Sequence, residues 1–425
     1  MDANSVLPTQ RNPCPVRADA TTRLPWVALV MILAVLAPGC AQQPRQATLP
    51  EQLADVAEIP GIPRARFWGD RLPPWFDQSI EIMRQQLARN FTKEEMILPS
   101  NYLAISGGGP NGAFSAGLMK GWSESGERPP FVIVTGVSTG ALVAPFAFLG
   151  PGYDDTLQTL YTTISTKDIV IERPIFSALL GDSLDDVTPL NHLLDKYITE
   201  DVMRGIAAKY REGRRLFIGT TNLDAGRPVI WDISEIANSG APNALHLIHE
   251  VLLASASVPG VFPPVYIDVV AYGKHFKEMH VDGGATSQLF LYPASLHWNT
   301  VAQDLALTGR HRLYIIRNSQ LSPDWQPVKP ELLPIVERSI DSLIRTQGIG
   351  DLYRMYLGVQ RDGIEYYLAD IPSSFKEVPK EQFDREYMTK LYELSYETAK
   401  DGYPWRRGPP GFESPEHSLP DNDGR

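Results

Sequence analysis

The sequence predicts an α/β fold in which a mostly parallel central sheet is sandwiched between helices, in three layers. Short apolar runs typical of buried strands alternate with longer stretches of helical periodicity along most of the chain. Parallel neighbours need a crossover connection, usually a helix, so this alternation favours a parallel sheet that is covered on both faces. In such sheets ligands bind outside the carboxyl ends of the strands, and we expect the functional residues there.

The composition is that of an ordinary globular protein and argues against several classes of function. Of the 425 residues, 43% are apolar and 21% are charged, which leaves enough apolar material for a core. With 39 Lys and Arg against 50 Asp and Glu, the net charge is −11, so nucleic acid is not expected as a partner. Both cysteines, Cys14 and Cys40, lie near the N-terminus, so the chain beyond them can hold neither a disulfide nor a cysteine-ligated zinc.

The N-terminus carries a predicted export signal. Residues 24–38 form an apolar run of 15 residues, too short to span a bilayer of about 30 Å but suited to the core of a signal peptide. Arg17 and Arg23 precede this run and supply the usual positive charge. The APGC sequence that ends at Cys40 resembles the bacterial lipoprotein signal, in which the cysteine becomes the lipidated N-terminus. The alternatives are an uncleaved anchor and an ordinary secretory signal.

Both ends of the chain are predicted to lie outside the folded domain. We expect residues 1–39 to be a lipoprotein signal peptide and Cys40 to be lipidated. No acidic retention signal follows Cys40, so the resemblance implies an outer-membrane lipoprotein of the bacterial cell envelope that faces the periplasm. Residues 40–66 are polar and proline-spaced and are predicted to be a flexible tether. Residues 401–425 are rich in proline, glycine and acids and are predicted to be a flexible tail.

Between these ends the sequence predicts a helical lead-in at residues 67–100 and a main domain at residues 101–400. Apolar residues between 76 and 87 recur at helical spacing, and this face either packs on the core or lies on a lipid surface, together with Trp68 and Trp75. Strands are predicted at residues 102–106, 131–135, 216–220, 229–232, 265–270, 313–317 and 364–369. Helices are predicted at residues 113–122, 139–149, 189–210, 244–257, 330–357 and 380–400.

A glycine-rich turn, GGGPNG at residues 107–112, follows the first strand of the main domain. The missing side chains of Gly107, Gly108, Gly109 and Gly112 let backbone N–H groups approach a ligand closely at the start of a helix. The turn is therefore predicted to cradle an anion.

A second turn, GVSTG at residues 136–140, follows the second strand. It is a G-x-S-x-G sequence between a strand and a helix, the context in which Gly136 and Gly140 leave room for Ser138 on a tight elbow. The sequence therefore predicts a nucleophilic serine on a tight elbow at the carboxyl end of a strand.

Asp282 is the candidate base for this serine. It ends a short apolar stretch and is followed by Gly283 and Gly284, a loop that can press against another backbone. Taken singly, an Asp-Gly-Gly sequence is more often a plain turn, and G-x-S-x-G alone is a weak pattern. The three motifs together favour nucleophilic catalysis.

In their order along the chain, GGGPNG, GVSTG and DGG resemble the patatin-like phospholipase family, whose members are serine lipid acyl hydrolases with a Ser–Asp dyad. The resemblance extends over residues 101–400. It implies that Ser138 is the nucleophile, that Asp282 is the general base, and that the N–H groups of residues 107–109 form the oxyanion hole. The segment ASASVPGVFPP at residues 254–264 also resembles a family segment near the active site.

The resemblance further implies hydrolysis of phospholipid or lysophospholipid acyl esters, without a cofactor, at a membrane reached through the lipid anchor. Protein partners stay open. Many family members carry Arg or Lys at the position of Asn111, so the electrostatic help of such a side chain is missing here. The histidines and acids show no spacing typical of metal ligands, so no metal is expected. Residues 153–189 form either a lid or a helical packing segment.

Three other interpretations stay open. An α/β-hydrolase would use a Ser-Asp-His triad, and His297 and His311 follow Asp282 in the required order. GGGPNG also satisfies the dinucleotide-binding pattern G-x-G-x-x-G, although residues 131–135 are not followed by the acid that such a site needs. Finally, the chain would be a membrane-anchored binding protein if it kept the fold without the chemistry, because a fold alone does not establish activity.

Overall fold

The computed structural model describes residues 47–92, 94–97, 100–172, 185–323, 325 and 327–412. The predicted signal peptide, Cys40 and the last part of the predicted tail lie outside these ranges, and so do residues 173–184 of the segment expected to be a lid or a packing element. In the part of the chain that is described, no helix is long and apolar enough to cross a membrane.

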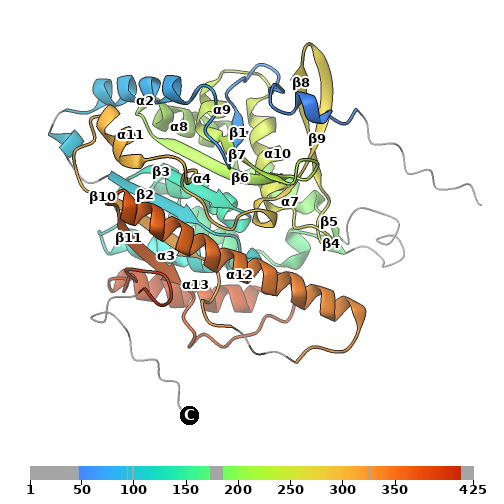
Figure 1. Ribbon diagram of the computed structural model, residues 1–425. Helices are drawn as coiled ribbons and strands as arrows, with labels where there is room; N and C mark the ends of the chain where they lie inside the picture. Colours follow the sequence, from blue (N-terminus) through green and yellow to red (C-terminus); the bar gives the residue numbers. More distant parts are fainter. Residues whose placement is uncertain are drawn as a thin grey trace, which may run out of the picture. The chain divides into compact units, whose positions relative to one another are not determined.

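A mixed sheet forms the centre of the fold (Figure 1). Within the described ranges it has nine strands: β1 (Arg66–Trp68), β2 (Ser100–Ile105), β3 (Phe131–Val137), β6 (Arg215–Asn222), β7 (Arg227–Asp232), β8 (Val265–Ala271), β9 (Lys274–Asp282), β10 (His311–Arg317) and β11 (Glu365–Asp370). The strand order is β1-β7-β6-β3-β2-β10-β11, with β9 paired to β6 and β8. The five strands from β6 to β11 are parallel, and the remaining pairs are antiparallel.

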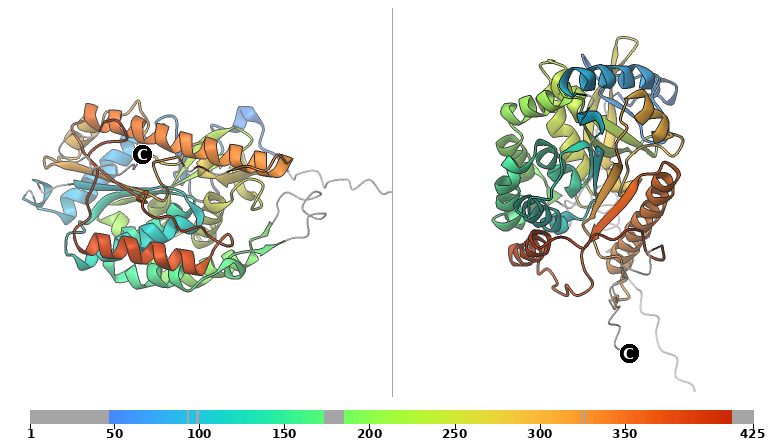
Figure 2. Two further views of the ribbon diagram at one scale, coloured as in Figure 1. Left: turned by 90° about the horizontal axis from the view of Figure 1, so that it is seen from below. Right: turned by 90° about the vertical axis from the view of Figure 1, so that its left-hand side faces the viewer.

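Helices cover both faces of this sheet (Figure 2). They are α2 (Phe76–Asn90), α3 (Gly112–Glu124), α4 (Thr139–Leu149), α5 (Asp154–Thr162), α7 (Thr188–Tyr197), α8 (Glu200–Arg211), α9 (Ile233–Asn238), α10 (Ala244–Ala256), α11 (Trp298–Asp304), α12 (Leu332–Arg361) and α13 (Arg385–Lys400). Because side chains alternate along a strand, Leu103 and Ile105 of β2 pack with α3, α4, α10 and α13, whereas Tyr102 and Ala104 pack with α2, α11 and α12. The predicted three-layer α/β fold is confirmed.

The predicted elements agree with this architecture, but the short elements β1, α9 and α11 were not predicted. The predicted strands 102–106 and 131–135 lie at β2 and β3. The predicted helix at residues 189–210 is two helices, because Thr199 begins α8 as a new helix and its side chain accepts a hydrogen bond from the N–H of Val202. Strand β9 was not predicted, because lysine, glutamate and histidine side chains interrupt its apolar pattern.

The predicted flexible tether is wrong for residues 47–66, which pack against the domain. Ile59 and Ile62 are buried in the core, and the backbone of Glu58 pairs with that of Val270 in β8 through hydrogen bonds of 3.0 and 2.8 Å. Isolated apolar side chains between the prolines, such as Leu49, thus reach the core. Residues 40–46 of the predicted tether lie outside the described ranges.

The predicted flexible tail also needs correction, over residues 401–412. The backbones of Arg406 and Leu368 exchange hydrogen bonds of 3.0 and 2.9 Å, which adds this segment to the outer side of β11. The ring of Trp405 lies 4.8 Å from that of Trp122 in α3. An aromatic side chain therefore holds a segment whose composition suggested disorder. The rest of the predicted tail lies outside the described residues.

The region of Trp68 packs inside the domain, which is the first of the two alternatives left open for the lead-in. Trp68 is 8% exposed, its indole N–H donates to Asp55 over 2.9 Å, and the guanidinium of Arg227 lies 4.1 Å from its ring centre. The neighbouring helix α2 buries Met83 and Leu87 against the sheet. Core packing, rather than a membrane surface, explains the helical pattern of the lead-in.

Candidate active site

Ser138 sits on a sharp elbow between β3 and α4. Its backbone has φ 56° and ψ −129°, a strained conformation for a residue with a side chain. A Cβ atom at Gly140 would lie 2.3 Å from the carbonyl oxygen of Ile105, so only glycine allows α4 to start so close to β2. The N–H of Ser138 donates to the hydroxyl of Ser255 over 3.0 Å. The predicted elbow is present, and it places the serine at the carboxyl end of the central strands.

Asp282 reaches the same edge from the last residue of β9. It pairs in register with Thr220 of β6, and β6 is the neighbour of β3, so β9 delivers the carboxylate to the strand end that carries the serine. One carboxylate oxygen accepts the N–H of Gly284 over 2.7 Å. The other, Oδ2, is buried and has no partner of hydrogen-bond geometry among the described residues, so it is free to receive a proton.

Burial determines the acidity of Asp282. It disfavours the charged form and raises the pKa of this carboxyl to about 6, while the Ser138 hydroxyl and the N–H of Gly284 oppose the rise. The Ser138 hydroxyl thus acts on this carboxyl as a neighbour, although it forms no hydrogen bond of ordinary geometry with Oδ2. The carboxylate is thus a stronger base than an ordinary aspartate and is still ionised at neutral pH.

The glycine-rich turn packs directly against the serine. A Cβ atom at Gly107 would lie 2.9 Å from the Cβ of Ser138, so a side chain there would displace the serine. Gly108 has φ 154° and presses against the backbone of Asn318, whereas Gly109 faces open space and lines the cavity beside the serine. The other motif glycines, Gly112, Gly136, Gly283 and Gly284, also lie where a Cβ atom would meet its nearest neighbour at 2.3–2.5 Å, with Gly136 and Gly283 pressed against backbone oxygens.

Asn318, which follows β10, anchors the glycine-rich turn and was not predicted as a site residue. It is fully buried, and its side chain donates to the carbonyl oxygen of Ser106 over 2.9 Å and accepts the hydroxyl of Ser115 over 2.6 Å. Asn111 donates to the carbonyl oxygen of Asn318 over 3.2 Å and accepts the hydroxyl of Tyr387 over 2.7 Å. The side chain that replaces the family's Arg or Lys therefore braces the turn.

Two further supports were missed because they belong to no motif. The side chain of Gln288 donates to the carbonyl oxygen of Gly284 over 3.2 Å. A Cβ atom at Gly107 would lie 2.9 Å from the amide oxygen of Gln288. Gln288 therefore lies between the loop after Asp282 and the glycine-rich turn. Buried Asp351 of α12 accepts the N–H groups of Gln288 and Leu289 over 2.6 and 3.1 Å. Only the fold brings these distant residues to the site.

The segment at residues 254–264, singled out in the sequence, connects the nucleophile with the base. Ser255 accepts the N–H of Ser138 and donates to the carbonyl oxygen of Gly219 over 2.7 Å. The N–H of Asp282 donates to the carbonyl oxygen of Ser257 over 2.9 Å. One end of α10 therefore holds both residues of the predicted dyad.

A mostly apolar cavity of about 450 Å³ opens beside Ser138. The side chains that line it come mainly from α4, α5, α7 and the 258–262 segment, and they include Leu142, Phe146, Ile164, Leu194, Val258 and Phe262. Asp341 of α12 is the one carboxylate in the described lining. A larger cavity of about 690 Å³ lies between α2 and α12 on the other face of the sheet, but it contains neither Ser138 nor Asp282. The smaller cavity is therefore the candidate substrate site.

The structure gives no support to the histidine triad or the nucleotide site. His311 begins β10, where its ring nitrogen is 2.8 Å from the hydroxyl of Tyr102, so it lies at the opposite end of the parallel strands from Ser138. His297 is exposed ahead of α11, and the described lining of the serine cavity contains no histidine. Gly107 and Gly108 of the glycine-rich turn pack against Ser138 and Asn318. No group of three or more potential metal ligands occurs among the described residues.

Comparison with known proteins assigns the domain. Residues 103–295 match the model of the family described as patatin-like phospholipase. This part of the chain is a patatin-like phospholipase domain. The family resemblance predicted from the motifs is confirmed for this part of the chain. No curated protein matches the sequence.

Three solved structures resemble the chain distantly. VipD from Legionella pneumophila shares 14% identity at a TM-score of 0.31, over 71% of this chain and 66% of that one. Human GIVD cytosolic phospholipase A2 shares 8% at a TM-score of 0.33, over 79% and 64%. The type III effector ExoU shares 10% at a TM-score of 0.21, over 71% and 53%. The chain thus spans about two thirds or less of each, and the patatin-like assignment depends on the domain match.

Proposed function

We propose that the patatin-like domain is a serine acyl hydrolase that works through a Ser138–Asp282 dyad. The observation that carries the proposal is the pairing of a strained, elbow-mounted serine with a fully buried carboxylate beside an apolar cavity. Asp282 takes the proton of the Ser138 hydroxyl as its oxygen attacks the ester carbonyl carbon. The protonated acid then gives this proton to the departing alcohol, which leaves an acyl-serine.

The second half of the reaction releases the acyl group. Water enters, gives a proton to Asp282 and attacks the acyl carbonyl, and the free fatty acid departs while Ser138 regains its proton. In both halves the carbonyl oxygen becomes negatively charged. The turn at residues 107–109 is the proposed oxyanion hole, because Gly107 packs against the serine and Gly109 lines the same cavity as Ser138.

The proposed substrates are the acyl esters of phospholipids or lysophospholipids. The serine cavity has the size of an ordinary ligand site, and its lining of leucine, isoleucine, valine and phenylalanine side chains suits an acyl chain better than a polar group. Asp341 is the charged exception, and burial raises the pKa of its carboxyl. A water-excluding site of this kind also strengthens the base and the oxyanion contacts.

The proposed location is the periplasmic face of the bacterial outer membrane, with Cys40 as the lipid anchor. The support is the leader sequence, whose apolar run and APGC sequence resemble a lipoprotein signal. Metabolic labelling with a radioactive or alkyne fatty acid tests this proposal. Label should enter the wild-type chain and be absent from Cys40→Ser, and label retained in that variant would contradict the anchor.

A fluorophosphonate probe tests the dyad. The probe should form a covalent adduct that maps to Ser138 by mass spectrometry, that is absent from Ser138→Ala and that forms at least about a hundredfold more slowly in Asp282→Asn. Ser239→Ala, which changes a serine outside the cavity, is the matched control and should label normally. Melting temperatures of all variants show that each is folded.

The competing interpretations predict different labelling. If His297→Gln or His311→Gln abolished labelling, a histidine triad would replace the dyad. If a folded wild-type protein formed no adduct even with lipid vesicles present, the domain would be a binding protein and the dyad proposal would fail. An adduct that survives in Ser138→Ala would move the nucleophile to another residue.

A further inference from the structure

An unusual concentration of exposed apolar side chains occurs between residues 325 and 343. Trp325 is 93% exposed and Leu343 is 70% exposed. The remaining members, at 42–49% exposure, are Val328, Ile335, Val336 and Ile340. Single exposed apolar residues are ordinary, but six within one short segment are not, and such patches usually mark an interaction site. These six residues are called the 325–343 surface below.

The two halves of α12 differ sharply in how they are used. In the C-terminal half, Leu352, Met355 and Val359 are buried against the sheet. The N-terminal half runs past the ends of the central strands (Figure 1), and the apolar residues of the 325–343 surface in this half face solvent. Packing within the domain therefore explains the sequence of one half of the helix and not of the other.

The exposed apolar residues of α12 form a stripe that faces away from the serine cavity. At about 100° per residue, Ile335, Val336, Ile340 and Leu343 lie within roughly 140° of one another around the helix. Asp341 lies on the opposite side, and it lines the cavity beside Ser138. This half of the helix therefore presents an apolar face to the outside, which is unusual for a surface helix.

We propose that the 325–343 surface docks on a phospholipid bilayer and so holds the domain at the membrane that contains its lipid substrate; this inference rests on the proposed function. The occupant follows from continuity, because one helix carries both the exposed stripe and part of the cavity lining. The acyl chain that fits this apolar cavity comes from a bilayer. An amphipathic helix lies in a membrane interface through such a face, and a tryptophan beside it suits the headgroup level.

Hydrolysis of two substrates separates docking from chemistry. The first is p-nitrophenyl butyrate, a soluble ester, and the second is a labelled phospholipid in phosphatidylcholine–phosphatidylglycerol vesicles. With the full-length chain, Trp325→Ser and Leu343→Ser should each lower the vesicle rate about tenfold, because each removes a large apolar group from the interface. Their rates on the soluble ester should stay within about twofold of wild type.

Ile97→Ser is the matched control. Ile97 is 61% exposed, a fraction similar to the 70% of Leu343. It precedes β2 and so lies at the opposite end of the central strands from Ser138. Neither rate should change in this variant. Equal vesicle rates in Leu343→Ser and Ile97→Ser would overturn the inference. It would also be overturned if Leu343→Ser dissociated a dimer in light scattering while keeping the vesicle rate, since the surface would then contact a second copy.

Fluorescence gives an answer that does not depend on catalysis. Vesicles with brominated acyl chains should quench wild-type tryptophan emission, and this quenching should fall clearly in Trp325→Phe. Equal quenching in the two proteins would contradict docking through this residue. If the wild-type chain hydrolysed neither substrate, the proposed function would fail, whereas the quenching difference would still support the docking surface.

Discussion

Asp282 must remain charged at neutral pH in order to accept a proton, yet it is fully buried at the end of β9. Burial raises its pKa to about 6, which places the titration of the proposed base in an accessible range. A base works only when it is ionised, so kcat/KM for a soluble ester should rise about tenfold per pH unit below pH 6 and level off above it. Initial rates between pH 4.5 and 8 check this. A midpoint near 4 would contradict a desolvated base, and one above 7 would point to a histidine.

The same burial predicts that Asp282 destabilises the fold. Its folded pKa is above the ordinary value of 3.8, so the folded state binds more protons between about pH 4 and pH 6. Protonated Asp282 therefore contributes its full stabilisation below pH 4, and this stabilisation is lost as the carboxyl ionises when the pH rises through 6. Asp282→Asn should raise the free energy of unfolding by about 2 to 3 kcal/mol at pH 7, since each pKa unit is worth about 1.4 kcal/mol.

Urea unfolding at pH 7 and pH 4 separates this effect from packing. The gain in Asp282→Asn should shrink to near zero at pH 4, where wild-type Asp282 is already neutral in the folded state. The matched control is Asp268→Asn in β8, an aspartate whose side chain is 57% exposed beside Lys277. It should change stability by less than about 0.5 kcal/mol at either pH. An equal gain at both pH values would show that ionisation of Asp282 is not the cause.

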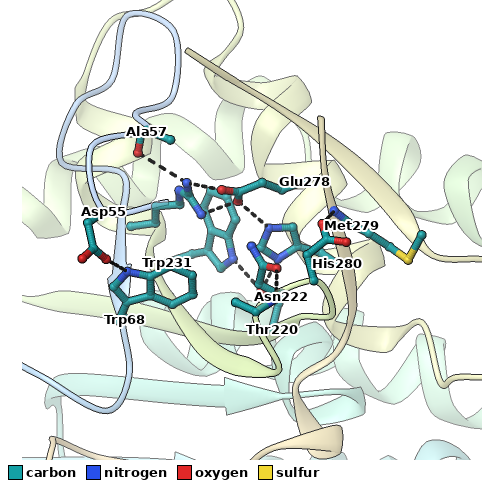
Figure 3. A network of polar contacts seen from close by, with 12 residues as sticks. Asp55, Ala57, Trp68, Thr220, Asn222, Trp231, Glu278, Met279 and His280 are labelled. Atoms are coloured by element: carbon teal, nitrogen blue, oxygen red, sulfur yellow. Dashed lines mark hydrogen bonds and ion pairs between the residues drawn. The ribbon is translucent and has the colours of Figure 1, made fainter. Parts of the chain in front are cut away.

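At the scale of single elements, a network of buried charged and polar side chains joins β9 to β1 and β6 (Figure 3). Glu278 accepts both guanidinium nitrogens of Arg66, over 2.5 and 2.9 Å, and lies 3.1 Å from a ring nitrogen of His280. The other ring nitrogen of His280 is 3.0 Å from the hydroxyl of Thr220. Burial alone would raise the pKa of Glu278, but Arg66 and His280 together lower it to about 2. The strand that ends in Asp282 is thus fixed by polar contacts.

Arg66→Met should therefore be costly. It leaves the Glu278 carboxylate, whose side chain is 1% exposed, without its main counter-charge, and breaking such a buried pair costs about 3–5 kcal/mol. The double variant Arg66→Met with Glu278→Gln should recover part of this loss, because no buried charge is then left. Arg71→Ala removes an exposed ion pair with Asp55 and should cost at most about 1 kcal/mol. Urea unfolding checks all three, and equal losses in Arg66→Met and Arg71→Ala would mean that the buried pair has no special role.

This network also shows where prediction from the sequence stops. Hydrophobic periodicity located β2 and β3, and the motif spacing identified Ser138, Asp282 and the glycine-rich turn, because local pattern determines those features. β9 was not predicted from its sequence, because the charge of its buried glutamate is balanced by Arg66, more than two hundred residues away. Asn318 and Gln288 were not predicted as site residues for the same reason. Only the strand order brings them beside the glycine-rich turn and the loop after Asp282.

At the scale of the whole molecule, sheet order assembles the candidate site. The glycine-rich turn, the serine elbow and the base follow β2, β3 and β9, and these strands are neighbours or are joined through β6. Parallel neighbours end at one edge, and β9, which is antiparallel to β6, ends where it pairs with Thr220 near the carboxyl end of β6. Motifs far apart in sequence therefore meet because the strands that carry them are neighbours in the sheet or are joined through β6.

The N-terminal segment belongs to this assembly, and its removal should unfold the domain. Residues 47–66 place Leu49, Ile59 and Ile62 in the core, each worth about 1.5–3 kcal/mol of burial, and they supply Arg66 to the buried network. Their sum is comparable to the 5–15 kcal/mol that stabilises a typical domain. A chain that starts at Ala47 should melt at the temperature of the full-length chain, whereas one that starts at Phe67 should lack a cooperative transition in circular dichroism. If the shorter chain melted within about 2 °C of the longer one, residues 47–66 would be the dispensable tether that their composition suggests.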